Sequence, residues 1–253
     1  MIVVMNPRDV MLAIAKKTGD IGASFYFVPE TVARAKELGL DGYRFYFLGR
    51  GGVLGDVDSA VIHSAFGYFH PRVIARMWDS SRKRMEPHYA AQAFIECGHM
   101  YGRRMFAEVD GLEDYVAAAT QLIAAVDGGA MALFAGVRAE PVPDDAPAAA
   151  IHQAMVLREM RGSAHLAAIT TVGLPMSIAH AIKRPDDVEL FGWGDEPPIV
   201  TDEARALHAR AEELTNEALA GPFASLTDDQ VAALIAGTDS MHAALQPGSG
   251  VTT

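Results

Sequence analysis

The sequence predicts a mainly α-helical protein in which amphipathic helices pack into a bundle. Of its 253 residues, 50% are hydrophobic, so enough apolar side chains are present for a sizeable core. Proline, or a capping Asp, Ser or Thr, repeatedly precedes a stretch with apolar residues at helical spacing, which indicates a helix start. Strand patterns are few, and the sequence contains no internal repeat. A globular helical protein is therefore expected.

Helices in the first half are predicted from prolines, capping residues and terminating glycines. Pro7 and Asp9 begin a helix that is expected to end before Gly19, and Pro71 begins another that runs toward Met85. The predicted helices of this half cover residues 7–17, 30–38, 59–68, 71–85, 88–107, 112–126 and 129–136.

A glycine-rich segment, Gly49 to Gly55, follows the aromatic stretch 43–48 and is predicted to be a loop. Glycines let a backbone approach a ligand closely, and Arg50 would reach from such a loop toward an anion. The segment lacks the Lys-Ser/Thr pair of a nucleotide-binding loop and the glycine spacing of a dinucleotide fingerprint. The alternative is a tight turn with a surface arginine.

The second half is predicted to contain a linker, a helical hairpin and two closing helices. Three prolines and three acidic residues in 139–147 indicate an exposed linker. The predicted elements after it are helices at 148–172 and 176–181, an extended stretch at 188–193, and helices at 201–220 and 227–236. We expect an N-terminal helical domain at 1–138, a C-terminal region at 148–245 packed on it, and a disordered tail at 246–253.

Charge is unevenly distributed along the chain. Residues 1–110 hold 14 Lys or Arg and 12 Asp or Glu, a balance of +2, whereas residues 111–253 hold 7 and 20, a balance of −13. An acidic surface repels a polyanion, and nonspecific DNA affinity comes largely from Lys and Arg contacts to phosphates. The composition therefore disfavours nucleic acid as a partner. The one basic cluster, at 72–84, is predicted to be a solvated helix face balanced by Asp79 and Glu86.

Neither a membrane span nor a secretion signal is predicted. The longest uncharged stretches, 115–126 and 166–181, are too short to cross a bilayer, and the N-terminus lacks a signal-peptide pattern. A cytoplasmic protein is expected. The single cysteine, Cys97, permits no intramolecular disulfide. No His-x-x-x-His, His-Glu-x-x-His or Cys-x-x-Cys spacing is present, so no metal site is predicted, and the sequence identifies no cofactor.

The long predicted helix of the second half places charged side chains in the middle of an apolar run. Arg158, Arg161 and His165 stand at i, i+3 and i+7 and therefore share one helix face. Guanidinium groups present planar forks of donors that match carboxylate or phosphate, so this face predicts an anion-binding wall. The alternative is an internal ion-pair network in which Glu159 or Glu30 neutralises the arginines.

Further side chains complete the predicted site. His70 precedes a proline, which biases it to an extended conformation from which it can cap the next helix and point its ring into the fold. The alternative for His70 is an ordinary core histidine. Tyr26 and Tyr68 would supply an aromatic lining for an amphipathic ligand. The candidate catalytic residues are His70 and His165, and the candidate ligand-binding residues are Arg50, Arg158, Glu159, Arg161, Tyr26 and Tyr68.

Four motifs in a defined order resemble a known family. They are Phe27-Val28-Pro29-Glu30, Phe47-Leu48-Gly49-Arg50, Phe69-His70-Pro71 and the stretch from Leu157 to His165. Together they are similar to a largely uncharacterised actinobacterial family of helix-turn-helix or winged-helix-like proteins. The resemblance implies a C-terminal part with a helix pair, a third helix, a short hairpin wing and a closing helix. Because Pro197-Pro198 leads directly to the closing helix, the resemblance implies a degenerate winged-helix-like region without the third helix.

Three functions are compatible with the sequence. The first is a small-molecule-binding protein with an Arg/His-lined pocket for an anionic or amphipathic ligand; as an enzyme it would use His70 or His165 as general acid or base. A haem ligated by histidine is a minor version of this hypothesis. The second is a winged-helix-type DNA-binding transcriptional regulator, and the third is a non-catalytic structural or interaction protein. A homodimer is compatible with each, since an apolar helical hairpin can form a dimer contact as well as a core.

Overall fold

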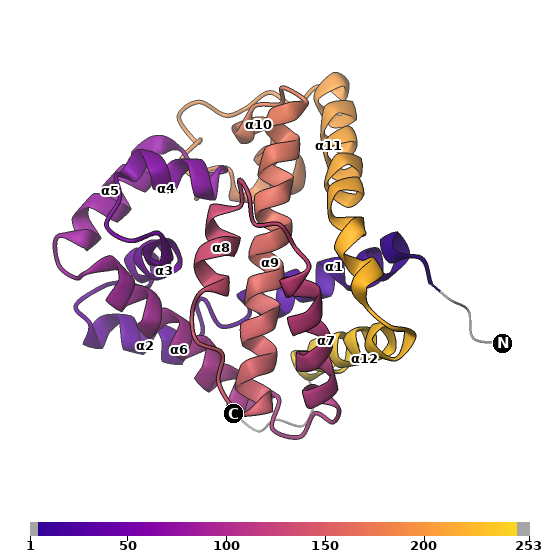
Figure 1. The fold of residues 1–253 in the computed structure, drawn as a ribbon. Coiled ribbons are helices and arrows are strands. Elements are labelled where there is room, and N and C mark those ends of the chain that lie inside the picture. Colours follow the sequence, from indigo (N-terminus) through magenta and orange to yellow (C-terminus); the bar gives the residue numbers. More distant parts are fainter. Residues whose placement is uncertain (1–4, 247–253) are drawn as a thin grey trace.

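The structure, a computed structural model, describes residues 5–246; residues 247–253 of the predicted tail lie outside this range. Within residues 5–246 the chain forms helices and connecting turns without a strand (Figure 1), which confirms the prediction of a mainly α-helical bundle. The α-helices are α1 (Pro7–Ala23), α2 (Pro29–Glu37), α3 (Gly42–Gly51), α4 (Ser59–Phe66), α5 (Pro71–Arg82), α6 (Pro87–Met105), α7 (Leu112–Ala124), α8 (Ala132–Arg138), α9 (Ala146–Thr171), α10 (Met176–Lys183), α11 (Asp202–Ala220) and α12 (Asp228–Ala244). The 3-10 helices are η1 (Gly52–Leu54), η2 (Pro185–Asp187) and η3 (Gly221–Ser225). No helix of the described range is both long and apolar enough to cross a membrane.

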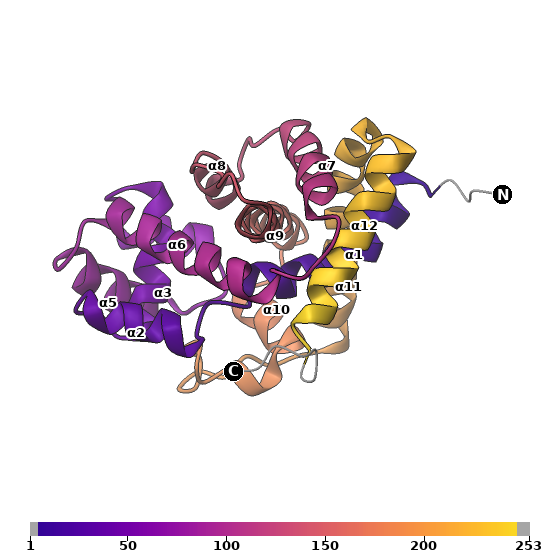
Figure 2. The same cartoon turned by 90° about the horizontal axis from the view of Figure 1, so that it is seen from below.

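The helix α9 forms the axis of the molecule. It contacts α1, α6, α7, α8 and α11, and Figure 2 shows it nearly end-on with α1, α6, α7 and α8 around it. Every residue from 148 to 157 is buried. A helix that packs on all sides needs apolar residues on all faces rather than along one stripe. The charged side chains in the second half of α9 therefore require specific partners.

Two groups of helices flank α9. The helices α2 to α6 lie on one side, and α7, α11 and α12 lie on the other (Figures 1 and 2). A continuous core cluster extends from Val10 in α1 to Met241 in α12, and a smaller one around Ile169 joins α9, α10 and α11. Both predicted segments, 1–138 and 148–245, contribute to the larger cluster. The division into two domains stays a prediction.

The helices α1 and α12 extend by more than one turn beyond the ends that the sequence predicted. The helix α1 continues through Gly19 because Ile21 is fully buried, and this packing offsets the low helix propensity of glycine. The helix α12 continues past Ala236, with Met241 buried in the core. Its predicted cap is present: the Thr227 side chain accepts a hydrogen bond from a backbone amide of the first turn.

The glycine-rich loop that the sequence predicted is absent, because the segment forms the last turn of α3 and then η1. These glycines permit close packing. A Cβ atom on Gly49 would lie 2.4 Å from the Cβ of Phe94, and one on Gly52 would lie 1.9 Å from the carbonyl oxygen of Pro87. The end of α3 therefore lies directly against α6, and Arg50 projects from a helix.

The segment between α10 and α11 is not the extended stretch that the sequence predicted. Val188 has helical backbone angles, with φ −55° and ψ −43°. Phe191 stacks on Phe69 with ring centroids 3.9 Å apart, and the indole of Trp193 donates to the carbonyl of Tyr68 at 2.8 Å. These contacts fold the segment onto the α4–α5 connection. In the described part of the chain, no hairpin wing follows α10.

Candidate functional site

A cavity of about 990 Å³ opens beside α9. Its wall combines residues of α1, α3, α4, α9, α10 and α11 with residues of the segment 184–191. Pockets that hold small molecules have volumes of roughly 300–1,000 Å³, so this cavity has the size of a ligand site. The second half of α9 contributes the charged side chains of Arg158, Glu159 and Arg161 to this wall.

Seven of the eight predicted site residues line this cavity: Tyr26, Arg50, Tyr68, Arg158, Glu159, Arg161 and His165. Tyr26 and Tyr68 lie in connections between helices, Arg50 lies on α3, and the other four residues lie on α9. The fold therefore brings together side chains that are far apart in the sequence. The reason is that α9 packs beside both α1 and α6, and α3 packs on α6. Their roles in binding or catalysis stay predictions.

Arg50 forms a buried ion pair with Glu159 through two parallel hydrogen bonds. Its Nε donates to Oε1 at 2.9 Å and its Nη2 donates to Oε2 at 2.8 Å, while Nη1 donates to the Tyr46 hydroxyl at 3.0 Å. The guanidinium also lies over the Phe66 ring, 4.4 Å from its centroid. Only 11% of the Arg50 side chain and 4% of the Glu159 side chain are exposed. This is the strong, two-pronged form of an ion pair.

Arg158 contacts the same carboxylate. Its Nη1 donates to Oε1 of Glu159 at 2.6 Å, and its guanidinium lies over Tyr26, 5.2 Å from the ring centroid. Among the residues that the structure describes, Glu159 is its one hydrogen-bond partner. A fraction of its side chain, 25%, remains exposed. Arg158 therefore retains N–H donors for a molecule in the cavity.

The cluster of Arg50, Arg158 and Glu159 carries an excess positive charge, because two guanidinium groups share one carboxylate. Burial by itself raises the pKa of Glu159, but the charges of Arg50 and Arg158 outweigh burial and lower this pKa to about 2. The carboxylate is therefore ionised at neutral pH. One guanidinium charge remains to be balanced, and an anion in the cavity would balance it.

The ion pair considered for Glu30 and the arginines of α9 is not formed, because Glu30 pairs with Arg104 at 3.2 Å. Arg161 instead joins α9 to α11. Its Nη2 donates to Oε2 of Glu212 at 2.8 Å, and its Nη1 donates to Oδ1 of Asn216 at 3.0 Å. Arg161 thus has two hydrogen-bond partners on α11, whereas Arg158 has the one carboxylate that it shares with Arg50.

His165 is held in one tautomer. The Thr215 hydroxyl donates to the carbonyl of Ala211 at 2.7 Å, so its oxygen accepts the hydrogen bond from Nδ1–H of His165 at 2.9 Å. Nε2 of His165 then carries the lone pair, and this atom is buried without a hydrogen bond to any residue in 5–246. Burial lowers the pKa of His165 well below its usual range, so the ring is neutral at pH 7.

Aromatic rings form much of the remaining wall. Phe191 stacks between Phe69 and His180, with ring centroids 3.9 Å and 3.8 Å away. Burial raises the pKa of Tyr26 to about 12 and raises the pKa of Tyr68 as well, so both phenols are uncharged at neutral pH. The cavity thus offers apolar surface next to arginine donors, which is what an amphipathic anion requires.

His70 lies apart from the other seven residues and does not line the cavity. Its Nδ1 accepts from the backbone N–H of Arg72 at 3.0 Å and so caps α5, as its place before Pro71 predicted. Its ring packs against Trp193, with centroids 4.6 Å apart. The structure therefore gives His70 the role of a helix cap that contacts the α10–α11 segment.

Several polar residues of the site region were missed by the sequence analysis. His180 and Glu212 line the cavity, and His208 lies beside Glu212. For His208 and Glu212 a signal was present, because positions i and i+4 share a face of the predicted acidic helix. His180 stands in a short helix with no local signal of its environment.

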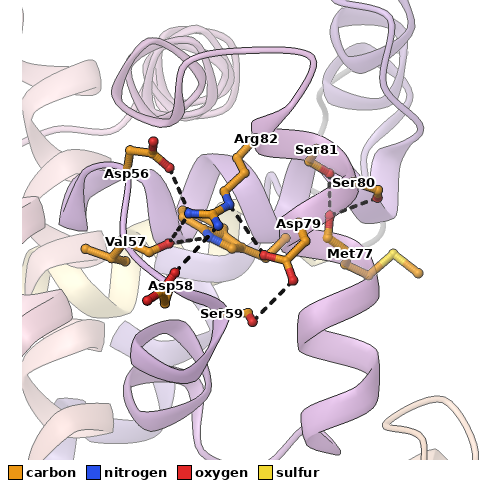
Figure 3. Close-up of polar contacts among 10 residues, drawn as sticks. Asp56, Val57, Asp58, Ser59, Met77, Asp79, Ser80, Ser81 and Arg82 are labelled. Carbon is orange, nitrogen blue, oxygen red and sulfur yellow. Dashed lines mark hydrogen bonds and ion pairs between the residues drawn. The ribbon is translucent and has the colours of Figure 1, made fainter.

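The helices α4 and α5 form a second feature, a helix pair joined by the turn 67–70, in which Gly67 has φ 72°. Arg82 at the end of α5 is bound by carboxylates, with contacts to Asp56 at 3.1 Å, Asp58 at 3.6 Å and Asp79 at 3.4 Å (Figure 3). Exposed basic residues that form no ion pair with any residue in 5–246 are Arg72 and Arg76 on α5 and Lys83 and Arg84 directly after it. They give this surface a positive charge.

Comparison with known protein families gives a match over most of the chain. A model described as a helix-turn-helix family matches residues 12–196, a range that contains α4 and α5 and ends before α11. Comparisons with curated proteins and with solved structures give no match.

Proposed function

We propose that this chain, which belongs to the helix-turn-helix family, binds a small amphipathic anion in the cavity beside α9. One observation carries the proposal: Arg50 and Arg158 share the single carboxylate of Glu159, and Arg158 is partly exposed on the cavity wall. A charge removed from water without a partner is costly. A carboxylate, sulfonate or phosphate that accepts from Arg158 would relieve that cost.

The remainder of the wall supports a ligand with an apolar body. The rings of Phe69, Phe191 and Tyr26 line the same cavity as Arg158. A ligand that extends from the guanidinium over these rings would bury apolar surface. Such burial stabilises binding by roughly 25 cal/mol for each Å² of apolar surface removed from water. A catalytic role for His165 stays a prediction, since the contacts of its ring identify a proton acceptor but no reaction.

Arg158→Met is expected to weaken the binding of 1-anilinonaphthalene-8-sulfonate, an aromatic anion, by about tenfold or more. A hydrogen bond to a charged group contributes about 1.5–3 kcal/mol, and this variant removes such a donor from the cavity wall. Folding should be retained, because Glu159 keeps both hydrogen bonds from Arg50. Fluorescence titration measures the affinity, and native mass spectrometry of freshly purified protein shows whether a bound molecule is lost from the variant.

Arg34→Met is the matched control, because Arg34 pairs with Glu37 on the surface of α2. This control should bind the probe as the wild type does. Equal affinity of the wild type and Arg158→Met would contradict the proposal. Loss of folding in Arg158→Met would also contradict it, because the charge cluster would then be an internal part of the scaffold.

The family match favours a second function, binding of duplex DNA through α4 and α5, and it supports this function more directly than it supports a ligand. Two helices joined by a short turn with a glycine are the layout of a helix-turn-helix, whose second helix lies in the major groove. The exposed residues Arg72 and Arg76 of α5 could contact phosphates. The formal net charge of −11 opposes such binding. Ligand binding and DNA binding are compatible in one protein.

A labelled random duplex is expected to show salt-sensitive binding if α5 contacts DNA. The double variant Arg72→Gln, Arg76→Gln should then reduce the slope of log K against log salt concentration by about 2, one for each lost phosphate contact. Fluorescence anisotropy measures this slope, and Arg210→Gln on α11 serves as a control. A wild-type protein that leaves the anisotropy unchanged at low salt would rule out this second function.

A further inference from the structure

We propose that His165, His208 and Glu212 form a binding site for a divalent transition-metal ion such as Zn²⁺ on the α9–α11 wall of the cavity. The sequence predicted no metal site, because the ligands come from two helices and show no standard motif. The proposal goes beyond the anion-binding function and does not depend on it, because Arg50, Arg158 and Glu159 take no part in this site.

The three side chains place suitable ligand atoms together. One nitrogen from each histidine and one oxygen from Glu212 all lie within 4.8 Å of one another. Imidazole nitrogen and carboxylate oxygen bind Zn²⁺ at about 2.0–2.2 Å, which puts neighbouring ligands of a tetrahedral ion roughly 3.3 Å apart. Small side-chain rotations would therefore bring the three ligand atoms to the spacing that such an ion requires. His208 and Glu212 share a face of α11, and His165 faces them from α9.

The Nε2 atom of His165 is the strongest indication of a missing partner. The residue is only 6% exposed, and within the described part of the chain Nε2 has no hydrogen-bond partner. This atom lies 3.6 Å from Oε1 of Glu212. Thr215 accepts the Nδ1–H hydrogen bond, so the unprotonated nitrogen is the one that faces the cluster. Metal-binding histidines generally donate through their other ring nitrogen in this manner.

Two cations beside Glu212 determine which oxygen is available. Arg161 binds Oε2 at 2.8 Å, whereas Lys183 Nζ lies 3.9 Å from Oε1. The Lys183 side chain is 57% exposed and can turn to solvent when an ion binds. His165 and Glu212 both line the cavity, so coordination positions left open by three protein ligands would face it. Such an ion would be accessible to a small molecule.

Titration of the metal-free protein with Co²⁺ tests the site, because Co²⁺ bound to nitrogen and oxygen ligands gives visible ligand-field absorption. We expect saturable binding of one ion per chain. His208→Gln should weaken it at least about tenfold, and Thr215→Val, which removes the group that orients His165, should weaken it about tenfold. Lys183→Met should strengthen binding, because it removes a positive charge that opposes the ion.

His242→Gln is the control, because His242 pairs with Asp20 outside the cluster at 3.3 Å. Its affinity for Co²⁺ should match that of the wild type. Unchanged affinity in His208→Gln, loss of binding in His242→Gln, or absence of saturable binding would overturn the proposal. His208→Gln is used rather than a variant of the buried His165, because His208 is half-buried and its substitution should leave the melting temperature unchanged. Probe binding to metal-free protein tests the anion proposal separately.

Discussion

Glu159→Gln is expected to lower the free energy of unfolding by about 3–5 kcal/mol, because it leaves the buried guanidinium of Arg50 and the partly buried guanidinium of Arg158 without a carboxylate. Three N–H groups of Arg50 and Arg158 donate to the carboxylate, whereas the amide of glutamine keeps one acceptor oxygen and carries no negative charge. Repulsion between the two cations would add to the cost. Urea unfolding at neutral pH measures the change.

Glu37→Gln provides the comparison, because Glu37 pairs with Arg34 at the surface, where an ion pair contributes less than about 1 kcal/mol. A similarly small effect of Glu159→Gln would show that the buried pair does not stabilise the fold. The pH dependence gives an independent check. The pKa of Glu159 falls from 4.5 to about 2 on folding, so its contribution is complete above about pH 4.5 and is lost as the pH falls toward 2. Glu159→Gln should reduce the loss of stability in that window.

Gly52→Ala is expected to destabilise the protein by about 3 kcal/mol, because the added methyl group has no space. Its Cβ would lie 1.9 Å from the carbonyl oxygen of Pro87 and 3.2 Å from the Cβ of Ala91. The first of these is a backbone atom of α6, so relief requires η1 to move away from α6. That shift would also displace Arg50 at the end of α3 and should weaken binding of the anionic probe.

Gly19→Ala is the matched control for this substitution. Gly19 lies within α1, and an added Cβ would meet no heavy atom of the described residues within 4 Å. Alanine is a better helix former than glycine, so this variant should be more stable than the wild type by about 0.5–1 kcal/mol. Thermal or urea unfolding compares the two variants. Equal effects at both positions would contradict the close packing of η1 against α6.

The two proposed sites share one wall of the cavity but differ in their local chemistry. Arg158 is set between Glu159 and Tyr26, where it can meet an anion. His165 lies two helical turns further along α9, with its lone pair toward α11. Because α9 supplies both, a change in its packing would affect both sites. The single-residue variants are therefore needed to distinguish one site from the other.

Local sequence patterns predicted most helix starts and missed some helix ends. Proline and capping residues act on the first turn, so the starts of α1, α5 and α12 were visible in the sequence. Helix ends depend on what the last turns contact. The continuation of α1 through Gly19 and the helical state of Gly49 result from burial against other helices, which no local pattern records.

The sequence by itself determined the helical class, the excess of acidic residues in the second half, and the alignment of Arg158, Arg161 and His165 on one helix face. These properties follow from composition and from the helical period, which are local. The tertiary structure decided which of those side chains keep a free donor or lone pair. It paired Arg161 with Glu212, gave Arg158 a carboxylate shared with Arg50, and left His70 outside the cavity lining. Such outcomes depend on distances between side chains from different helices, and these distances exist only after the helices have packed.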